Sequence, residues 1–321
     1  MAFDGTAVSG ADSVSSKPTD FESTDFEPAD FGSATSGELF RPKYAKVFST
    51  FARNSLVRDM TFRFNFLLQC VSSIGWTLMN VGFYLIIFQY TDSIGEGSGW
   101  DRDKFFLFIA TTWFVNSLVQ AFFMPNAEEF SELIRTGGLD FALLKPIDTQ
   151  FLISFQKVDW SALTNFFAGL VIVAVSLYNL ATREVNPLVP SGASVLLYVF
   201  FLGCGVAIMY SLMISLSATS IWLGRNQTLY NFWFYITNFS RYPMEMYNHG
   251  WGRPLYGLFT FIVPVLLVVN VPARLLARPI DPRTQEEWLM VVWALIATAL
   301  SLCASRWVFR KALLSYRSAS S

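Results

Sequence analysis

Ionisable side chains are scarce in this chain. Charged residues make up only 15% of the 321 residues, whereas hydrophobic residues make up 53% and aromatic residues 17%. A soluble domain ordinarily contains about 25% charged residues. The shortage is concentrated in long stretches without any charge, which is typical of a protein that crosses a membrane. A soluble enzyme of one or two domains is therefore excluded.

Cysteine, histidine and nucleotide-binding loops are also lacking. Cys70, Cys204 and Cys303 lie far apart within apolar runs, and His249 is the single histidine. No zinc-binding spacing is present, so we predict no metal site and no catalytic residue. The chain also contains no Gly-x-x-x-x-Gly-Lys-Ser/Thr loop, which would hold nucleotide phosphates. We therefore predict no enzymatic activity, no cofactor bound by this chain and no nucleic acid partner.

The N-terminal residues 1–38 differ from the rest of the chain. They contain eight acidic residues and one lysine, and the remainder of the chain is basic. A five-residue unit recurs three times around Phe21, Phe26 and Phe31, and this spacing fits neither a helix face nor a strand face. We predict a disordered acidic tail. The alternative is a short linear motif whose phenylalanines dock on a partner.

The next segment, 39–64, is basic and amphipathic. Tyr44, Val47, Phe48 and Phe51 recur at the spacing of one helix face, whereas Lys46 and Arg53 project from the opposite face. This pattern predicts a helix that lies in the membrane interface with its cations near lipid headgroups.

Six apolar runs follow, each close to the roughly 20 residues that a bilayer requires. They predict an all-α membrane protein with six transmembrane helices over 65–315, at about 65–89, 105–125, 162–181, 194–222, 255–273 and 288–305. The aromatic segment 229–247 is predicted to be interfacial or re-entrant, with a seventh span as the rival topology.

Lysine and arginine residues before the first run and after the last place both termini in the cytoplasm. The loop between the fifth and sixth runs disagrees with this orientation, because Arg274, Arg278 and Arg283 then lie outside.

The predicted spans contain amides instead of charges. Asn80, Asn116, Gln120 and Asn165 are either helix-to-helix hydrogen-bonding residues or the lining of a substrate path. A carrier that binds its own driving ion is disfavoured, because such carriers place ionisable groups at mid-membrane.

Proline and glycine mark three further features of the spans. Pro264 is expected to kink the fifth span, and Pro272 is expected to mark its end. Gly203 and Gly205 are expected to allow close helix packing in the fourth span.

The most informative polar stretch lies between the second and third runs, at 128–146. Phe130, Leu133 and Ile134 share one face of a short helix that Gly137 and Gly138 can end. An apolar face with an acidic flank, placed in the cytosol between two spans, suits a lever that docks into a soluble partner. A plain interfacial loop helix is the alternative.

This stretch carries a resemblance to a known family. Residues from Ile134 to Pro146 resemble the IR-x-G-x-LD-x-x-LL-K/R-P signature of ABC-2-type exporter permeases, in particular a poorly characterised bacterial subfamily encoded as permease pairs with a separate ATPase. The segments 51–66, 241–247, 261–264 and 271–273 agree with the same subfamily. The resemblance covers about residues 40–315, and the acidic tail departs from it.

The resemblance implies a six-helix permease with an amphipathic N-terminal elbow helix in a bacterial plasma (inner) membrane. Its partners would be a second permease, identical or paralogous, membrane lipid and an ABC ATPase subunit that binds ATP and Mg. The coupling segment to the ATPase would comprise Glu128, Glu132, Leu133, Ile134, Arg135, Gly137, Leu139, Asp140, Lys145 and Pro146. The alternative function is a membrane scaffold that transports nothing and recruits partners through its N-terminal tail.

Overall fold

The structure is a computed structural model that describes residues 43–95, 99–184, 186–223, 227–277 and 285–316. The predicted acidic tail lies outside the described residues. The described chain is helical throughout and contains no strand, only one isolated bridge between Ser93 and Asp101. The predicted fold class, an all-α membrane protein, is confirmed.

Five helices are long and apolar enough to cross a membrane. They agree with the predicted runs, because each run holds enough apolar residues for the bilayer core. The helices are α2 (Arg63–Tyr90), α3 (Arg102–Phe122) continued by α4 (Met124–Arg135), α7 (Thr164–Ala181), α8 (Gly192–Ala218) and α13 (Gln285–Ser315).

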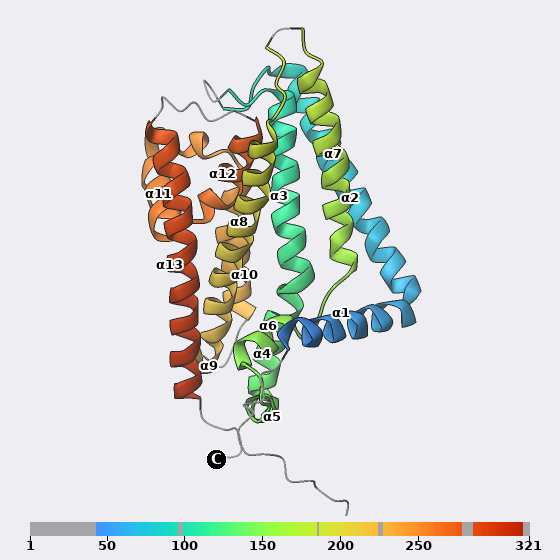
Figure 1. Cartoon of the computed structure of the whole chain (residues 1–321), viewed down its shortest axis with the longest axis vertical. Coiled ribbons are helices and arrows are strands. Elements are labelled where there is room, and N and C mark those ends of the chain that lie inside the picture. Colours follow the sequence, from blue (N-terminus) through green and yellow to red (C-terminus); the bar gives the residue numbers. More distant parts are fainter. Residues whose placement is uncertain (1–42, 96–98, 185, 224–226, 278–284, 317–321) are drawn as a thin grey trace, which may run out of the picture. The chain divides into compact units, whose positions relative to one another are not determined.

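Figure 1 shows that these helices form a bundle with two distinct ends. The α1 end carries α1 (Tyr44–Thr61), α4, the short helix α5 (Gly138–Leu143) and the last turn of α13. The opposite end carries the connections before α3 and before α8. We use these two names for the ends below.

The fifth predicted span is not a straight helix. The chain from Gly250 to Ile262 meets α12 (Val265–Ala277) at an angle of 86°. The break falls at Val263 and Pro264, as expected for a residue without a backbone N–H. Pro272, however, lies inside α12, so the expectation that it ends the span is wrong.

Short elements connect α8 to this break. They are α9 (Ser220–Leu223), α10 (Gln227–Asn238), η2 (Phe239–Arg241), η3 (Met244–Tyr247), η4 (Gly250–Gly252), α11 (Arg253–Gly257) and a π-helical turn at Leu258–Ile262. At about 1.5 Å per residue, α10 and α12 are each about 20 Å long, which is less than the bilayer core of about 30 Å. Neither helix is long enough to cross the bilayer core by itself, and the interfacial or re-entrant position of 229–247 stays a prediction.

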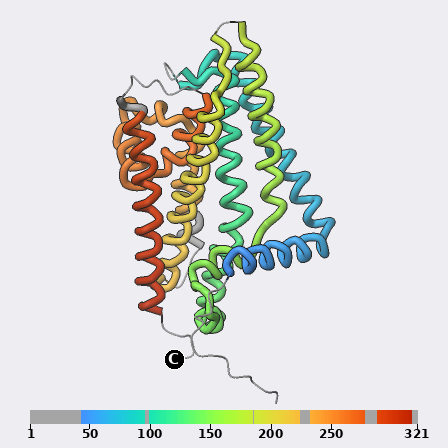
Figure 2. Tube along the Cα trace, viewed as in Figure 1, coloured from blue at the N-terminus to red at the C-terminus, as the bar shows by residue number. Residues whose placement is uncertain are grey.

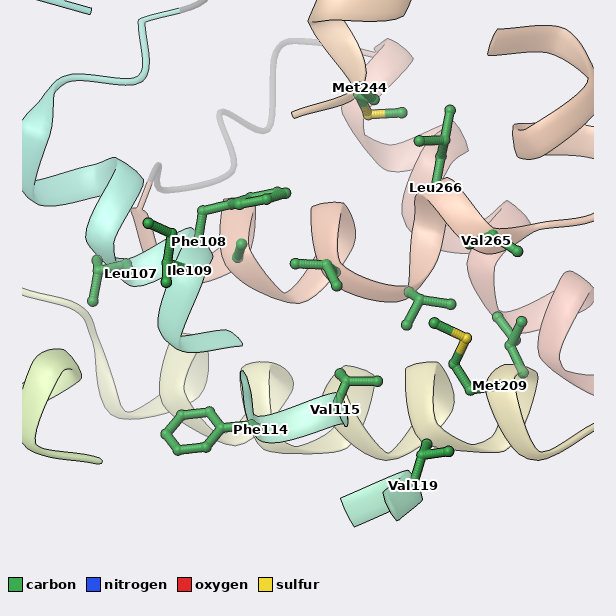
Figure 3. Packing of buried hydrophobic residues seen from close by; sticks show 14 of the residues in the cluster. Leu107, Phe108, Ile109, Phe114, Val115, Val119, Met209, Met244, Val265 and Leu266 are labelled. Atoms are coloured by element: carbon green, nitrogen blue, oxygen red, sulfur yellow. The ribbon is translucent and has the colours of Figure 1, made fainter. Parts of the chain in front are cut away.

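The main hydrophobic core lies where α3, α8 and α12 meet. Twelve of the 13 residues of α12 are buried. Figure 3 shows side chains from the three helices converging there, with Met244 of η3 beside Leu266. The amide of Asn270 fixes this arrangement, because its oxygen accepts a hydrogen bond from Met244 N at 2.8 Å and its nitrogen donates to Leu266 O at 2.8 Å.

Helix α2 is the least attached of the five long helices. Only Thr77 of its 28 residues is buried. Tyr84 and Phe88 contact Phe105 near the opposite end, and the helix diverges from α3 as it approaches α1 (Figure 2). Its remaining surface is available to lipid or to another protein chain.

Candidate functional site

The segment from α4 to α6 (Thr149–Phe155) forms a compact block at the α1 end. Pro125 lies in the first turn of α4, where its missing N–H costs nothing. Gly137 takes a left-handed conformation with φ of 74°, which a residue with a side chain rarely adopts, and α4 ends there. The chain then turns into α5.

The apolar face of α4 packs into the protein. Phe130 and Leu139 are fully buried, and the rings of Phe130 and Phe309 lie 5.9 Å apart. Leu133 and Ile134 pack against the same cluster, to which α8 contributes Ile214 and Ala218 and α13 contributes Phe309 and Ala312. This differs from our expectation that the face docks on a soluble partner, because the ends of α8 and α13 already cover it.

The exposed apolar residues of the block lie on α5 instead. Phe141 is 73% exposed, Leu144 is 81% exposed and Leu143 is 40% exposed. We call these three residues the α5 tip, and Figure 1 shows α5 farthest from the bundle at the α1 end. The sequence pattern missed them, because a helix of six residues is too short to show a period.

The predicted polar residues of the segment surround this tip unevenly. Glu128, Glu132, Arg135, Lys145 and Pro146 are exposed, and Glu132 accepts a hydrogen bond from Arg135 Nε at 2.9 Å. The structure thus brings the predicted residues into one block but divides them between a buried face and an exposed one. Asp140 is half-buried and interacts with Tyr316 at the end of the described chain.

A polar network joins the block to two long helices. Arg306 of α13 donates hydrogen bonds to Asp148 Oδ1 at 3.0 Å and to Gln150 Oε1 at 2.8 Å. Gln150 Nε2 in turn donates to the hydroxyl of Tyr210 on α8 at 3.0 Å. The hydrogen bond from Arg306 is the main cause that lowers the pKa of Asp148. Asp148 caps the first turn of α6, and a cap of this kind can be recognised in the sequence. Its contact with Arg306, 158 residues away, could not be predicted from the sequence.

The face of α1 that the sequence assigned to the membrane also packs on protein. Tyr44 contacts Phe151 with ring centroids 4.8 Å apart, and Phe48 contacts Phe155 at 5.6 Å. These contacts hold α1 against α6, and its predicted position in the membrane interface stays a prediction. Lys46 and Arg53 are exposed on another side of α1.

The four candidate path-lining residues have different environments. Asn165 Oδ1 accepts a hydrogen bond from Thr77 Oγ1 at 3.1 Å and so joins α7 to α2. Asn80 donates to the carbonyl of Trp76 within its own helix at 2.9 Å. Asn116 and Gln120 lie one turn apart on α3. Asn116 is half-buried and Gln120 is exposed. No hydrogen bond joins these four residues to one another in the described part of the chain.

Ion pairs of two arginines stabilise the opposite end of the bundle. Arg183 pairs with Asp101 at 2.9 Å and also with Asp103. Arg274 lies within α12 and not in the external loop that we expected, and it pairs with Glu245 at 2.7 Å. This pairing accounts for one of the three arginines that disagreed with the predicted orientation, and Arg278 and Arg283 lie outside the described residues.

Comparison with known proteins identifies the family. The family described as ABC-2 family transporter protein matches residues 74–320, more than three quarters of the chain. The chain therefore belongs to this family and is a multi-pass membrane component of a transporter, and membership implies association with an ABC ATPase in general. Neither the curated proteins nor the solved structures contain a match.

Proposed function

We propose that this chain is the permease subunit of an ATP-driven exporter in a bacterial plasma membrane, and that a separate ATPase subunit docks on its α5 tip. The single observation that carries the proposal is the position of Phe141 and Leu144. Both are large apolar residues, both are exposed, and both lie at α5, which extends farthest from the bundle at the α1 end. Exposed apolar clusters of this kind mark protein interaction sites.

The charge distribution supports a cytoplasmic location for this tip. Basic residues flank the α1 end of the bundle, which fits the excess of lysine and arginine on the cytoplasmic side of membrane proteins. These residues are Lys43, Lys46, Arg53, Arg58, Arg63, Arg306, Arg310 and Lys311.

The attachment of the block supports a coupling role. The α4–α6 block is joined to α13 by the Asp148–Arg306 pair and to α8 by the hydrogen bond between Gln150 and Tyr210. A rigid contact of this kind passes a displacement of the block to both helices. The proposal therefore replaces Leu133 and Ile134, which are partly buried against α8 and α13, with the α5 tip as the contact surface.

The exposed surface of α2 supports a second permease as partner. Asn65, Gln69 and Ser72 recur along one side of the helix and are all exposed, and Asn80 lies on the same side. Polar side chains are unfavourable in hydrocarbon and usually face another helix or water. We assign this side of α2, with Asn116 and Gln120 of α3, to the interface with the second permease and the substrate path.

Copurification tests the docking site. The chain is expressed with the ATPase encoded beside it, either as wild type or with Phe141→Asp and Leu144→Asp. Burial of two such side chains contributes about 3 kcal/mol or more, so the double variant should weaken binding by about a hundredfold. The matched control is Val189→Asp, which changes an apolar residue of equal exposure, 73%, at the opposite end.

Three results distinguish the alternatives. Loss of the ATPase from the double variant alone, with unchanged melting of the permease, supports the α5 tip as the docking site. Retention of the ATPase by the double variant refutes that site. If no ATPase copurifies with the wild-type chain, the exporter function itself is refuted and the scaffold function becomes the better hypothesis.

A further inference from the structure

Tyr210 of α8 packs against two hydrophobic clusters at once. It contacts the main core and also the cluster around Phe130 at the α1 end. Its ring centroid lies 4.7 Å from that of Phe123, the residue between α3 and α4. Among the residues that the structure describes, no other side chain belongs to both clusters.

The hydroxyl of Tyr210 forms two hydrogen bonds to α6. It accepts one from Gln150 Nε2 at 3.0 Å and lies 2.8 Å from Ser154 Oγ. Ser154 donates its only hydroxyl proton to the carbonyl oxygen of Gln150, at 2.6 Å. Tyr210 is therefore the donor to Ser154, and both of its partners on α6 are buried.

The side-chain amide of Gln150 has one possible orientation. Its Oε1 atom accepts a hydrogen bond from Arg306 of α13 at 2.8 Å, and an arginine side chain can only donate. The Nε2 atom therefore faces Tyr210. Without the Tyr210 hydroxyl this buried donor would lose its acceptor, which is unfavourable. The hydroxyl thus fixes the position of α8 relative to α6.

Helix α8 contacts more of the interior than α13 does. It contributes buried residues to the main core (Met209), to the Phe130 cluster (Ile214) and to a third cluster with α12 and α13 (Phe201). In the described part of the chain, α13 contributes buried residues only to the last two. A displacement of the α4–α6 block that acts through Tyr210 therefore reaches all three clusters.

We propose that Tyr210 is the positioning residue through which the α4–α6 block moves α8. Loss of its hydroxyl then uncouples the movement of the bundle from the ATPase while the ATPase stays bound. This inference rests on the proposed function and identifies the contact that transmits the movement within it. The α5 tip binds the ATPase, and Tyr210 passes the displacement to the spanning helices.

The reactivity of Cys204 reports movement of α8. Cys204 is half-buried and precedes Gly205, which lies at the close contact between α8 and α12. The full-length chain with Cys70→Ser and Cys303→Ser is purified with the ATPase encoded beside it and reconstituted in nanodiscs. The rate at which N-ethylmaleimide modifies Cys204 is then measured with and without ATP and vanadate. ATP should change this rate, and Tyr210→Phe should abolish the change with the ATPase still bound.

The matched control is Tyr198→Phe, which removes another hydroxyl of α8. The Tyr198 hydroxyl is hydrogen-bonded to Thr111 Oγ1 of α3 at 3.1 Å and not to the α4–α6 block. A purely structural effect should therefore appear in both variants. Ser154→Ala removes the acceptor on α6 and should also reduce the ATP-dependent change, which tests the same contact without altering α8.

The possible results separate transmission from docking and from stability. Loss of the ATP-dependent change in Tyr210→Phe but not in Tyr198→Phe, with the ATPase bound to both, supports the inference. An unaltered change in Tyr210→Phe overturns it, as does an equal loss in Tyr198→Phe. Release of the ATPase by Tyr210→Phe also overturns it, because the residue would then serve docking. So does a wild-type rate that ATP leaves unchanged, because α8 then does not move. If the wild-type chain retains no ATPase, the proposed function itself fails, and that result does not involve Tyr210.

Discussion

Replacement of Gly205 by alanine should force α8 and α12 apart. A Cβ atom built on Gly205 lies 2.5 Å from the carbonyl oxygen of Val268, which is too close for any real contact. That oxygen belongs to the α12 backbone, so it cannot rotate away as a side chain can. Pro272, four residues later, has no N–H to donate to it, which leaves the carbonyl free to approach α8.

The expected cost follows from this distance. Relief of the clash requires a separation of about 1 Å along a buried interface, and overpacking of this kind costs about 1–3 kcal/mol. Alanine is a better helix former than glycine by about 1 kcal/mol, which offsets part of this cost. We therefore expect a net loss of up to about 2 kcal/mol and an apparent Tm lower by up to about 4 °C.

The assay compares Gly205→Ala with Gly203→Ala by thermal unfolding in detergent, followed by tryptophan fluorescence. A Cβ on Gly203 meets no atom within 4 Å, so this control should melt at the wild-type temperature or slightly above it. If both variants melt together, the close contact between α8 and Val268 does not exist and the reasoning is wrong.

The other predictions concern the α1 end and the tail. Asp148→Asn should destabilise the chain by about 1 kcal/mol, allowing for the partial exposure of the Asp148–Arg306 pair. Because the pKa of Asp148 is lowered in the folded chain, its contribution to stability is complete above about pH 4 and is lost as the pH falls through the lowered value. Asp148→Asn should remove that step from a stability-against-pH curve, and its persistence would contradict the assignment. Deletion of residues 1–38 should leave the ATPase complex intact on a sizing column, whereas a scaffold would lose its partner.

The positions of the helices could be predicted from the sequence because the bilayer imposes a length. Five of the six apolar runs became long helices that begin within a few residues of the predicted starts, although α13 extends ten residues beyond the predicted end at 305. A kink at Pro264 could be predicted in the fifth run, but its angle could not, because hydropathy records apolarity and not direction. The bend of 86° at Pro264 and the continuation of α12 through Pro272 depend on contacts with α3 and α8 that are distant in sequence.

The candidate site was predicted only in part, for a related reason. The spacing of Phe130, Leu133 and Ile134 indicates that one face of α4 is covered, but it does not indicate by what. In the structure Phe309 and Ile214, from two other helices, cover that face. The exposed α5 tip lies in a helix too short for periodicity, and its exposure depends on the fold of the whole block.

Helix α8 connects the α4–α6 block with α12. It is 27 residues long, about 40 Å, and it extends through the bundle without a break. At the α1 end its Ile214 packs in one cluster with Phe130 of the α4–α6 block. Farther along, its Gly205 contacts Val268 of α12. A displacement of the block therefore moves α12 with α8.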